Sequence, residues 1–155
     1  MITTAQINDP DSVEFFAQAD PTIRPRLGLA ISTANGAVTT IVAALDLAPG
    51  KRSGRHTHSV EEVVLVLEGM ATMTVNDEQV RLSPGEMVLV PALAHHELAN
   101  AGSEELRTVA FFPNAALVSV FDDVLSPVES RVLVTPPPDE APTDIPVVIA
   151  EKTSV

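Results

Sequence analysis

Short runs of apolar and β-branched residues recur along most of the chain, and turn residues separate them. Glycine, proline, asparagine and aspartate interrupt the runs, as at Gly69 and at Ser83-Pro84-Gly85. The runs that predict strands cover residues 27–32, 38–47, 62–67, 71–75, 79–82, 87–90, 95–99 and 106–112. Strands this short, at such regular spacing, predict an all-β sandwich or barrel. Asn35-Gly36 lies between the first two runs and predicts a tight hairpin, because these residues accept positive φ angles.

Two segments outside these runs carry helical signals. Asp9-Pro10 has the form of an N-cap followed by proline at the first helical position, which predicts a short helix through residues 12–16. In the segment 117–125, apolar residues recur as on one helical face until Ser126-Pro127, which predicts a helix packed on the barrel. The β-branched Val118 and Val120 of that segment also fit a strand.

Length and composition fit one globular domain. The chain has 155 residues, of which 45% are hydrophobic and 19% charged, so it can bury a single core. We expect an N-terminal arm with its short helix over residues 1–25, a barrel with a C-terminal helix over residues 26–135, and a proline-rich acidic tail over residues 136–155.

Charge and cysteine content exclude several classes of partner and chemistry. The formal net charge of -12 argues against nucleic acid or an anionic membrane as a partner, because both would repel an acidic surface. No apolar run approaches the roughly 20 residues of a membrane helix, and the N-terminus lacks the basic and apolar regions of a signal peptide, so we expect a cytoplasmic protein. The absence of cysteine excludes disulfides and thiolate ligands.

Three of the four histidines and one glutamate fall into two spaced patterns. The first is Gly50-x5-His56-x-His58-x3-Glu62-x6-Gly69, and the second is Gly85-x5-Pro91-x4-His96-x3-Asn100. The even spacing within the first pattern places its histidines and glutamate on one face of a strand, so these side chains can converge. Three imidazoles and a carboxylate suit one divalent transition metal ion better than calcium or magnesium, which prefer oxygen ligands. Iron, manganese, nickel, copper and zinc all accept such a set, so its identity stays open.

These two patterns resemble the two motifs of the cupin family, and the resemblance covers residues 50–100. Every fixed position of the first motif matches, and one position of the second departs, because Leu93 stands where the family usually has glycine. The resemblance implies an antiparallel double-sheet jelly-roll barrel with a metal inside it, held by His56, His58, Glu62 and His96. It does not name a reaction, since cupins include dioxygenases, isomerases, epimerases, decarboxylases, sugar-binding modules and storage proteins.

Strand parity separates the predicted ligands from their neighbours. Glu61 and His95 fall on the faces opposite to Glu62 and His96, which indicates a surface charge and a rim histidine. Leu98 shares the face of His96 and is expected to line the cavity. Asn100 closes the second motif, and a turn contact suits it better than a chemical role.

Two further groups of residues near the site leave their roles open. Lys51, Arg52 and Arg55 precede the first motif histidine and either attract an anionic substrate or form a solvated basic loop. The remaining candidates either form the cavity wall or pack in the ordinary core, and they are Met73, Met87, Phe111 and Phe112.

The composition favours an apolar cavity, because the chain has no Trp or Tyr and only five Phe. This counts against sugar substrates, which bind through aromatic faces and several hydrogen-bond donors. We therefore expect an oxygenase or related oxidoreductase acting on a small enolic or phenolic molecule, with Glu62 both as a ligand and as the base that accepts the substrate's proton. The alternative is a nonredox isomerase, epimerase or lyase, or a metal-dependent binding module without catalysis.

The strand that follows the first motif histidines is apolar on both faces. Val64 and Val66 share the inward face of Glu62, yet Val63, Leu65 and Leu67 on the other face are equally apolar. Such a strand needs cover on its outer face as well, from the other sheet, from the C-terminal helix or from a second subunit. Together with the family resemblance, this pattern favours a homodimer.

Overall fold

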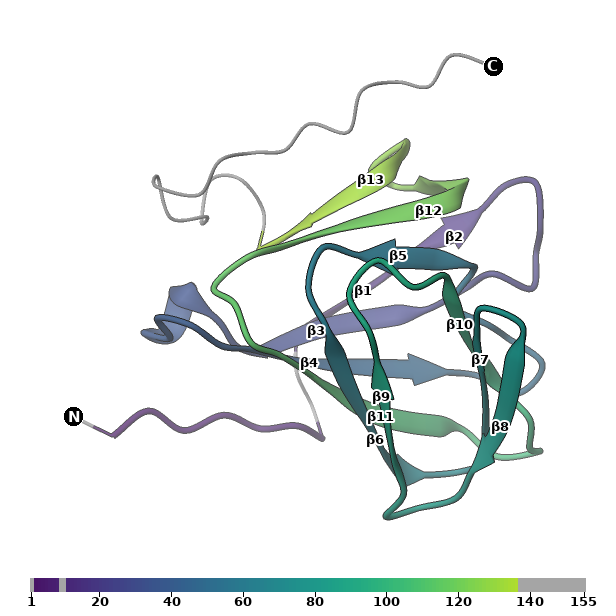
Figure 1. Ribbon diagram of the computed structural model, residues 1–155, viewed down its shortest axis with the longest axis horizontal. Coiled ribbons are helices and arrows are strands. Elements are labelled where there is room, and N and C mark those ends of the chain that lie inside the picture. Colours follow the sequence, from purple (N-terminus) through teal and green to yellow (C-terminus); the bar gives the residue numbers. More distant parts are fainter. Residues whose placement is uncertain (1, 9–10, 137–155) are drawn as a thin grey trace.

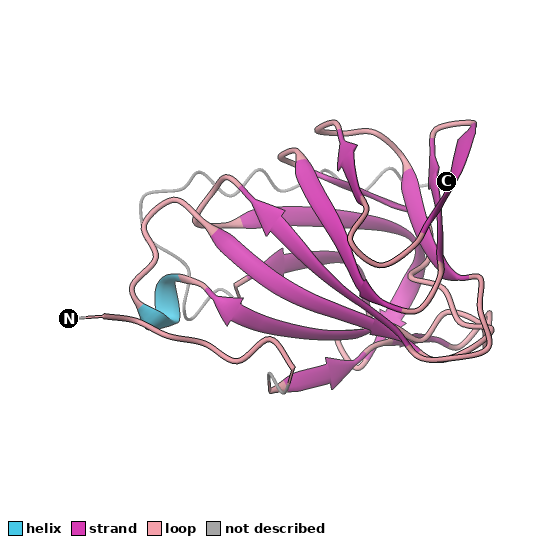
Figure 2. Cartoon of the chain, turned by 90° about the horizontal axis from the view of Figure 1, so that it is seen from below, coloured by secondary structure: helices cyan, strands magenta, loops and turns pink. Residues whose placement is uncertain are grey.

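Two antiparallel β-sheets face each other in the computed structural model, which describes residues 2–8 and 11–136 (Figures 1 and 2). Within those residues there are thirteen strands and one short 3-10 helix, η1 (Thr33–Asn35). None of the described residues lies in a helix with the length and apolar character that crossing a bilayer requires. The expected double-sheet jelly roll is confirmed.

Every strand pairing in the two sheets is antiparallel. The six-stranded sheet has, in spatial order, β1 (Ser12–Glu14), β3 (Arg26–Ile31), β4 (Ile41–Leu47), β11 (Leu106–Phe112), β6 (Glu62–Glu68) and β9 (Met87–Val90). The seven-stranded sheet has, in spatial order, β13 (Ser130–Thr135), β12 (Leu117–Ser126), β5 (His56–His58), β10 (His96–Asn100), β7 (Ala71–Val75) and β8 (Glu78–Leu82), with β2 (Phe16–Ala17) beside β12.

The core lies between the sheets and follows the two-residue period of the strands. On β6, Val64 and Val66 are almost fully buried, while Val63 and Leu65 are half-buried on the outer face. Inward residues of both sheets form the main cluster, with Met73 and Leu98 among its most buried side chains. Each such side chain contributes about 1.5–3 kcal/mol through removal of its apolar surface from water. This packing fixes which face of each strand carries the site.

The predicted C-terminal helix is wrong, because residues 117–126 form strand β12. Leu117, Ser119 and Phe121 are buried, whereas Val118 and Val120 between them are half-buried, which is a period of two. Strand β12 pairs with β5 on one side and with β13 on the other. These long-range hydrogen bonds outweigh the local helical spacing. Strand β13 itself was not predicted.

The predicted N-terminal helix is also wrong. Its residues form strands β1 and β2, and Val13 of β1 pairs with Leu27 of β3. The Asp9-Pro10 signal lies outside the described residues, as does the expected tail apart from Pro136. The division of the chain into arm, barrel and tail stays a prediction.

The predicted antiparallel pair around Asn35-Gly36 exists as β3 and β4, but η1 and not a two-residue turn begins the connection. Of the pair Asn35-Gly36, only Gly36 has a positive φ, of 99°. Asn35 instead accepts a hydrogen bond from the Ser32 amide over 2.8 Å through its side chain, in a capping box. The side chain of the asparagine, and not its backbone freedom, stabilises this connection.

Two backbone positions around the motifs need unusual conformations. Gly69 has a φ of 85°, and a Cβ there would lie 2.6 Å from the Glu105 carbonyl oxygen, so no other residue fits. Leu93 has a φ of 64°, so the leucine adopts the left-handed conformation that the family's glycine would adopt freely. The amide of Leu93 donates to the His58 carbonyl over 2.9 Å, which ties this turn to the strand that carries two of the histidines. The turn is therefore strained, and His96 keeps its inward position.

Replacing Leu93 with glycine should stabilise the protein. Relief of left-handed strain contributes about 1–2 kcal/mol. The greater backbone freedom of glycine in the unfolded chain offsets about 0.5–1 kcal/mol of that. The Leu93 side chain is 69% exposed and loses little packing. We expect a gain of about 0.5–1 kcal/mol in the free energy of unfolding, measured by urea denaturation.

The matched control is Ala92→Gly, at an exposed neighbour without a positive φ. This variant should lose about 0.5–1 kcal/mol. Equal losses in the two glycine variants would show that Leu93 is not strained.

Candidate metal centre

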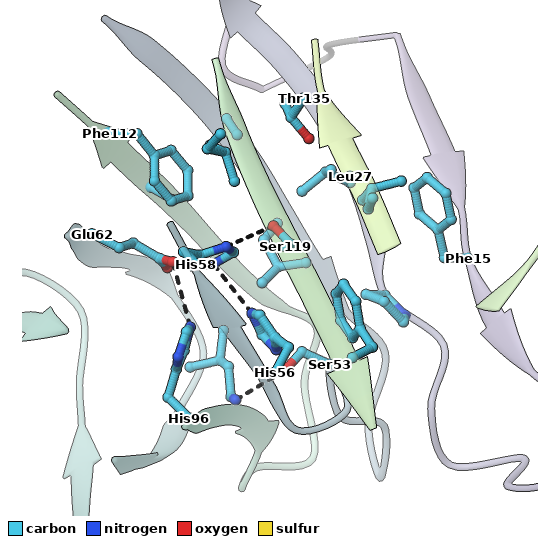
Figure 3. A pocket seen from close by; sticks show the side chains of 18 of the residues that line it. Phe15, Leu27, Ser53, His56, His58, Glu62, His96, Phe112, Ser119 and Thr135 are labelled. Atoms are coloured by element: carbon cyan, nitrogen blue, oxygen red, sulfur yellow. Dashed lines mark hydrogen bonds and ion pairs between the residues drawn. The ribbon is translucent and has the colours of Figure 1, made fainter. Parts of the chain in front are cut away.

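Four buried side chains from three strands meet between the sheets (Figure 3). His56 and His58 are two residues apart on β5 and therefore face inward together. His96 begins β10 and is paired directly with His56, so the third imidazole comes from the neighbouring strand. Glu62 begins β6 in the opposite sheet, so the predicted single strand face for both histidines and the glutamate is wrong: the chain turns after His58, and Glu62 meets them from across the barrel. All four are between 3% and 9% exposed.

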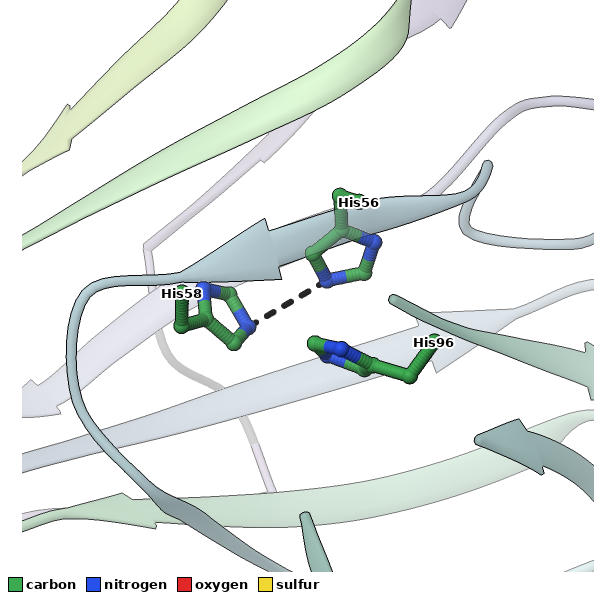
Figure 4. Close-up of side chains that lie close together, drawn as sticks. All are labelled: His56, His58 and His96. Atoms are coloured by element: carbon green, nitrogen blue, oxygen red, sulfur yellow. Dashed lines mark hydrogen bonds between the residues drawn. The ribbon is translucent and has the colours of Figure 1, made fainter. Parts of the chain in front are cut away.

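The Nδ1 atoms of the histidines are held by the surrounding structure. The Nδ1–H of His56 donates to the Gly54 carbonyl over 2.7 Å, and that of His96 donates to the Ala94 carbonyl over 2.9 Å. In these two tautomers Nε2 has no hydrogen and presents a lone pair. The Nδ1 of His58 lies 2.7 Å from the Ser119 hydroxyl. The Nε2 atoms of all three rings point toward a common centre (Figure 4).

Around this centre, acceptor atoms approach each other closely. The Nε2 atoms of His56 and His58 are 3.2 Å apart, and a Glu62 carboxylate oxygen is 2.6 Å from the Nε2 of His58. The same oxygen is 3.6 Å from the Nε2 of His96. Among the described residues, that oxygen and the His96 nitrogen are buried without a hydrogen-bond partner. Orphaned acceptors in a buried space favour a cation between them, so the four residues fit a transition metal ion.

Electrostatics support the same arrangement. Burial lowers the pKa of His56 well below its usual value, and His96 and His58 lower it further, so this ring stays neutral and able to bind a metal. Burial acts to raise the pKa of Glu62, but contacts with His58 and His96 outweigh it and hold that pKa below the ordinary range. The carboxylate is therefore ionised.

Ser119 is a part of the site that the sequence analysis missed. It is buried on β12, directly opposite His58, and contacts the Nδ1 of that ring. A hydroxyl both donates and accepts, so Ser119 can accept from Nδ1–H when Nε2 is a ligand and donate to Nδ1 when Nε2 is protonated. Ser119 could have been found as a serine at an inward position of an alternating apolar run. The interpretation of residues 117–125 as a helix concealed this alternation.

Comparison with known proteins places this geometry in a family. A family model described as the Cupin domain matches residues 44–112, which include all four converging residues. Residues 44–112 therefore form a cupin domain.

Individual cupin relatives are distant. The chain is 35% identical over 65 residues to the acireductone dioxygenase of Leishmania infantum, covering 39% of this chain and 19% of that protein. It is 33% identical over 75 residues to the tetracenomycin polyketide synthase protein TcmJ of Streptomyces glaucescens, covering 48% of this chain and 50% of that protein. The chain thus matches half or less of the length of either relative.

Solved structures confirm the fold. An oxalate decarboxylase from Lactobacillus farciminis superposes with a TM-score of 0.64 at 23% identity, over 74% of this chain and 34% of that one. At this level of identity the likeness concerns the cupin fold and not the reaction.

The residues next to the converging set take the positions that parity predicted. Glu61 and His95 are exposed on the opposite faces of their segments. Asn100 has a structural role, because its side-chain amide donates to the carbonyls of Leu47 and Glu104 over 2.9 and 2.8 Å.

The basic cluster of Lys51, Arg52 and Arg55 contacts carboxylates and a carbonyl of the protein itself. Arg52 pairs with Asp20 and Glu97, each over 2.5 Å. The Lys51 ammonium donates to the Pro21 carbonyl over 3.1 Å. Arg55 lies 3.8 Å from a carboxylate oxygen of Asp122 and is half-exposed. These contacts favour a structural role for the cluster over anion capture.

The centre opens onto an apolar cavity whose wall includes Leu98, Met73 and Phe112. Phe112 meets the His58 ring edge to face at 5.1 Å, and Phe121 stacks on His56 at 4.5 Å. The other two candidate wall residues, Met87 and Phe111, lie on the outer face of the six-stranded sheet and are exposed. The expected apolar cavity is present, with half of the candidates in its wall.

Replacing any one of His56, His58 and His96 with alanine should strip most of the metal from the protein. Loss of a partner that only orients a ligand typically costs about 10–100-fold in metal affinity, so loss of a ligand should cost at least about 100-fold. Metal content by elemental analysis after supplementation and buffer exchange measures this. Glu62→Gln should keep part of the metal, because three imidazoles remain.

The matched controls are His95→Ala and Glu61→Gln, the exposed neighbours of two of these residues. Both should load like the wild type. If the wild type and the three histidine variants are equally empty after supplementation, no such metal centre exists.

Proposed function

We propose that this cupin is a metal-dependent oxygenase acting on a small enolic or phenolic substrate. The observation that carries the proposal is the convergence of three imidazoles and an ionised carboxylate at an apolar cavity. His56, His58, His96 and Glu62 would hold one divalent transition metal, a ligand set that iron, manganese, nickel, copper and zinc all accept. The bound metal would supply Lewis acidity and, if redox-active, a path for electrons from substrate to dioxygen.

The chain's own residues have definable parts in this function. The carbonyls of Gly54 and Ala94 and the Ser119 hydroxyl fix the orientation of the three rings. Phe112 and Phe121 shield the centre from water, which protects reactive species. Glu62 has a carboxylate oxygen without a hydrogen-bond partner beside the cavity, and that oxygen would accept the proton of the substrate's O–H.

The relatives support an oxygenase in part. A dioxygenase, that of Leishmania infantum, is among the proteins to which this chain is similar. The similarity covers 39% of this chain and about a fifth of that enzyme's length, so the activity of this chain is an inference from its own site.

A nonredox reaction is the second candidate. Its specific support is the similarity to a polyketide synthase protein that covers half of that relative. The same site could polarise a carbonyl for isomerisation or lyase chemistry, with Glu62 moving a proton and no change in oxidation state. It could also bind a small molecule without turnover. A redox-inert metal would suffice in both cases.

Oxygen consumption distinguishes the two candidates. Metal-free protein is loaded separately with iron(II), manganese(II), nickel(II) or zinc(II) and supplied with enolic, β-dicarbonyl or flavonol-like substrates while dissolved oxygen is followed. We expect oxygen uptake only when a redox-active metal and a suitable substrate are both present, and none with zinc. Glu62→Gln should lower the rate by about 10²–10⁴-fold through loss of the proton acceptor, while Glu61→Gln leaves it unchanged.

Substrate conversion by the zinc form without oxygen would exclude the oxygenase and support the nonredox candidate. A fully active Glu62→Gln variant would remove the proposed role of that carboxylate.

We also propose that two copies of the chain associate through the outer face of the six-stranded sheet. Register places Leu89, Val63, Phe111, Val42 and Ile31 side by side in one row across five strands. A row of apolar side chains this long indicates an interface. The row itself carries no charge, so on a chain with a net charge of -12 it is where two like-charged copies can approach with least repulsion.

The outer face of the seven-stranded sheet differs along β10, β7 and β8, whereas β12 and β13 place Val120 and Val132 side by side on it. One row across β10, β7 and β8 consists of Glu97, Thr74 and Gln79. A second row consists of Ala99, Thr72 and Arg81. A sheet face of this kind is stable in water without a partner. The contrast between the two outer faces favours one interface, on the six-stranded sheet.

Leu89→Glu should dissociate the dimer. Leu89 is 57% exposed, so the folded monomer tolerates the change, but an unpaired carboxylate at the interface would cost several kcal/mol and weaken association by more than about 100-fold. Sedimentation velocity measures the mass. The control is Gln79→Glu on the other outer face, which should leave the dimer intact. A wild-type protein that is monomeric at high micromolar concentration would refute the interface.

A further inference from the structure

The cavity at the candidate metal centre extends sideways between the sheets, across the strands. On one wall, His58 of β5 is paired with Ser119 of β12, which is paired with Leu133 of β13. Neighbouring strands lie about 4.8 Å apart, so Leu133 is about 10 Å from the histidine strand. His58, Ser119 and Leu133 all line the cavity.

The opposite wall follows the same direction. From Glu62 on β6 the lining passes to Ala110 on β11, then to Leu45 on β4 and to Leu27 on β3. Three strand spacings separate β6 from β3, which is about 14 Å. Phe15 and Leu133 lie with Leu27 at the end away from the histidines, as Figure 3 shows for Phe15 and Leu27. The cavity is therefore about 10–14 Å long, with the four ligands at one end.

The polar groups of the lining are few, and most are engaged. The Ser53 hydroxyl donates to the Gly54 carbonyl over 3.1 Å and accepts from the Leu98 amide over 3.0 Å. Ser119 contacts His58. Besides the four ligands and these two serines, Thr135 is the one other hydrogen-bonding side chain among the described lining residues. A molecule in the cavity can thus exchange few hydrogen bonds with its wall.

The cavity is also narrow. The centres of water-sized molecules can occupy only about 60 Å³ of it, although it contacts side chains from both sheets along its whole length. A branched or globular molecule does not fit such a slot, whereas a flat ring system or an extended chain does.

We propose that the ligand of this cupin is an elongated molecule with one oxygen-bearing end and an apolar body. The oxygen-bearing end lies at His56, His58, His96 and Glu62, and the body lies along the slot toward Leu27 and Leu133, which determine the length that is accepted. This proposal rests on the proposed function for the position of the oxygen-bearing end, and it adds the apolar body and the two residues that select it.

The body should contribute much of the affinity. Each buried methylene tightens binding by about fourfold, because its removal from water is favourable and the apolar wall loses nothing. A substrate consisting of the oxygen-bearing end alone would leave the slot empty and bind weakly.

Binding to the zinc-loaded wild-type protein tests the proposal without turnover. Two probes share a hydroxy-ketone group that can chelate zinc: 3-hydroxypyran-4-one has little else, and 3-hydroxyflavone carries an extended apolar body. Calorimetry or flavone fluorescence gives the dissociation constants. We expect 3-hydroxyflavone to bind at least 30-fold more tightly, roughly what burial of a few methylene equivalents supplies.

Variants locate the body. Leu133→Trp fills the slot from the seven-stranded sheet and should weaken 3-hydroxyflavone by at least tenfold, as the buried body is displaced, while the small probe is unaffected. Leu27→Trp does the same from the six-stranded sheet and serves if Leu133→Trp does not fold. Val38→Trp, at a residue that is 80% exposed and outside the cavity lining, is the matched control and should change neither constant.

The binding results distinguish a failure of the apolar-body proposal from a failure of the proposed function. If the small probe binds the zinc form and the flavone binds no more tightly, or if the flavone binds the two slot variants as well as the wild type, the apolar-body proposal is wrong and the metal centre stands. If neither probe binds the loaded protein, the proposed position of the oxygen-bearing end is wrong, and the proposed function falls with it.

Discussion

The Nε2 atoms of three histidines and one carboxylate oxygen approach each other in a space that excludes water, and this arrangement sets the demands on the rest of the structure. Acceptors at 2.6 to 3.6 Å repel one another unless a proton or a metal ion lies between them. The barrel overcomes the repulsion by pairing β5 with β10 and closing the other sheet over both. Each ring is further fixed at Nδ1, by the carbonyls of Gly54 and Ala94 and by the Ser119 hydroxyl.

Holding the site in this way imposes constraints on the backbone next to it. The turn before His96 places Leu93 in the left-handed region, where its amide bonds to the His58 carbonyl. The turn at Gly69 brings the chain so close to Glu105 that a side chain is excluded. Local strain is tolerated in such places because the packed strands on either side determine the geometry.

The inner and outer faces of the two sheets differ in polarity. The inner faces form a mainly apolar core around the histidine cluster, and the cavity extends from that cluster toward β3 and β13. The outer face of the seven-stranded sheet is polar along β10, β7 and β8, whereas that of the six-stranded sheet presents an apolar row across five strands. One face therefore suits solvent and the other a partner, while the space between them suits a ligand that is mainly apolar.

The sequence by itself determined the strands from Glu62 to Phe112 and the inward faces of His56, His58, Glu62 and His96. The strands and the shared face of His56 and His58 depend on a period of two within one strand, which is a local property of the chain. Glu62 points inward as expected, but from a separate strand in the other sheet and not from the strand of the two histidines. The same parity placed Glu61 and His95 outside the site. The cupin motifs added the expectation that the two patterns meet, which no local spacing could supply.

Only the tertiary structure decided the elements at both ends and the extent of the cavity. Residues 12–16 and 117–125 carry helical signals, yet they are strands because partners far away in sequence satisfy their hydrogen bonds: β3 for β1, and β5 and β13 for β12. Ser119 reaches His58 across 61 residues, and Leu27 and Leu133 meet at the end of the cavity from opposite sheets. Such contacts arise from packing between distant segments, so they exist only once the two sheets have closed on each other.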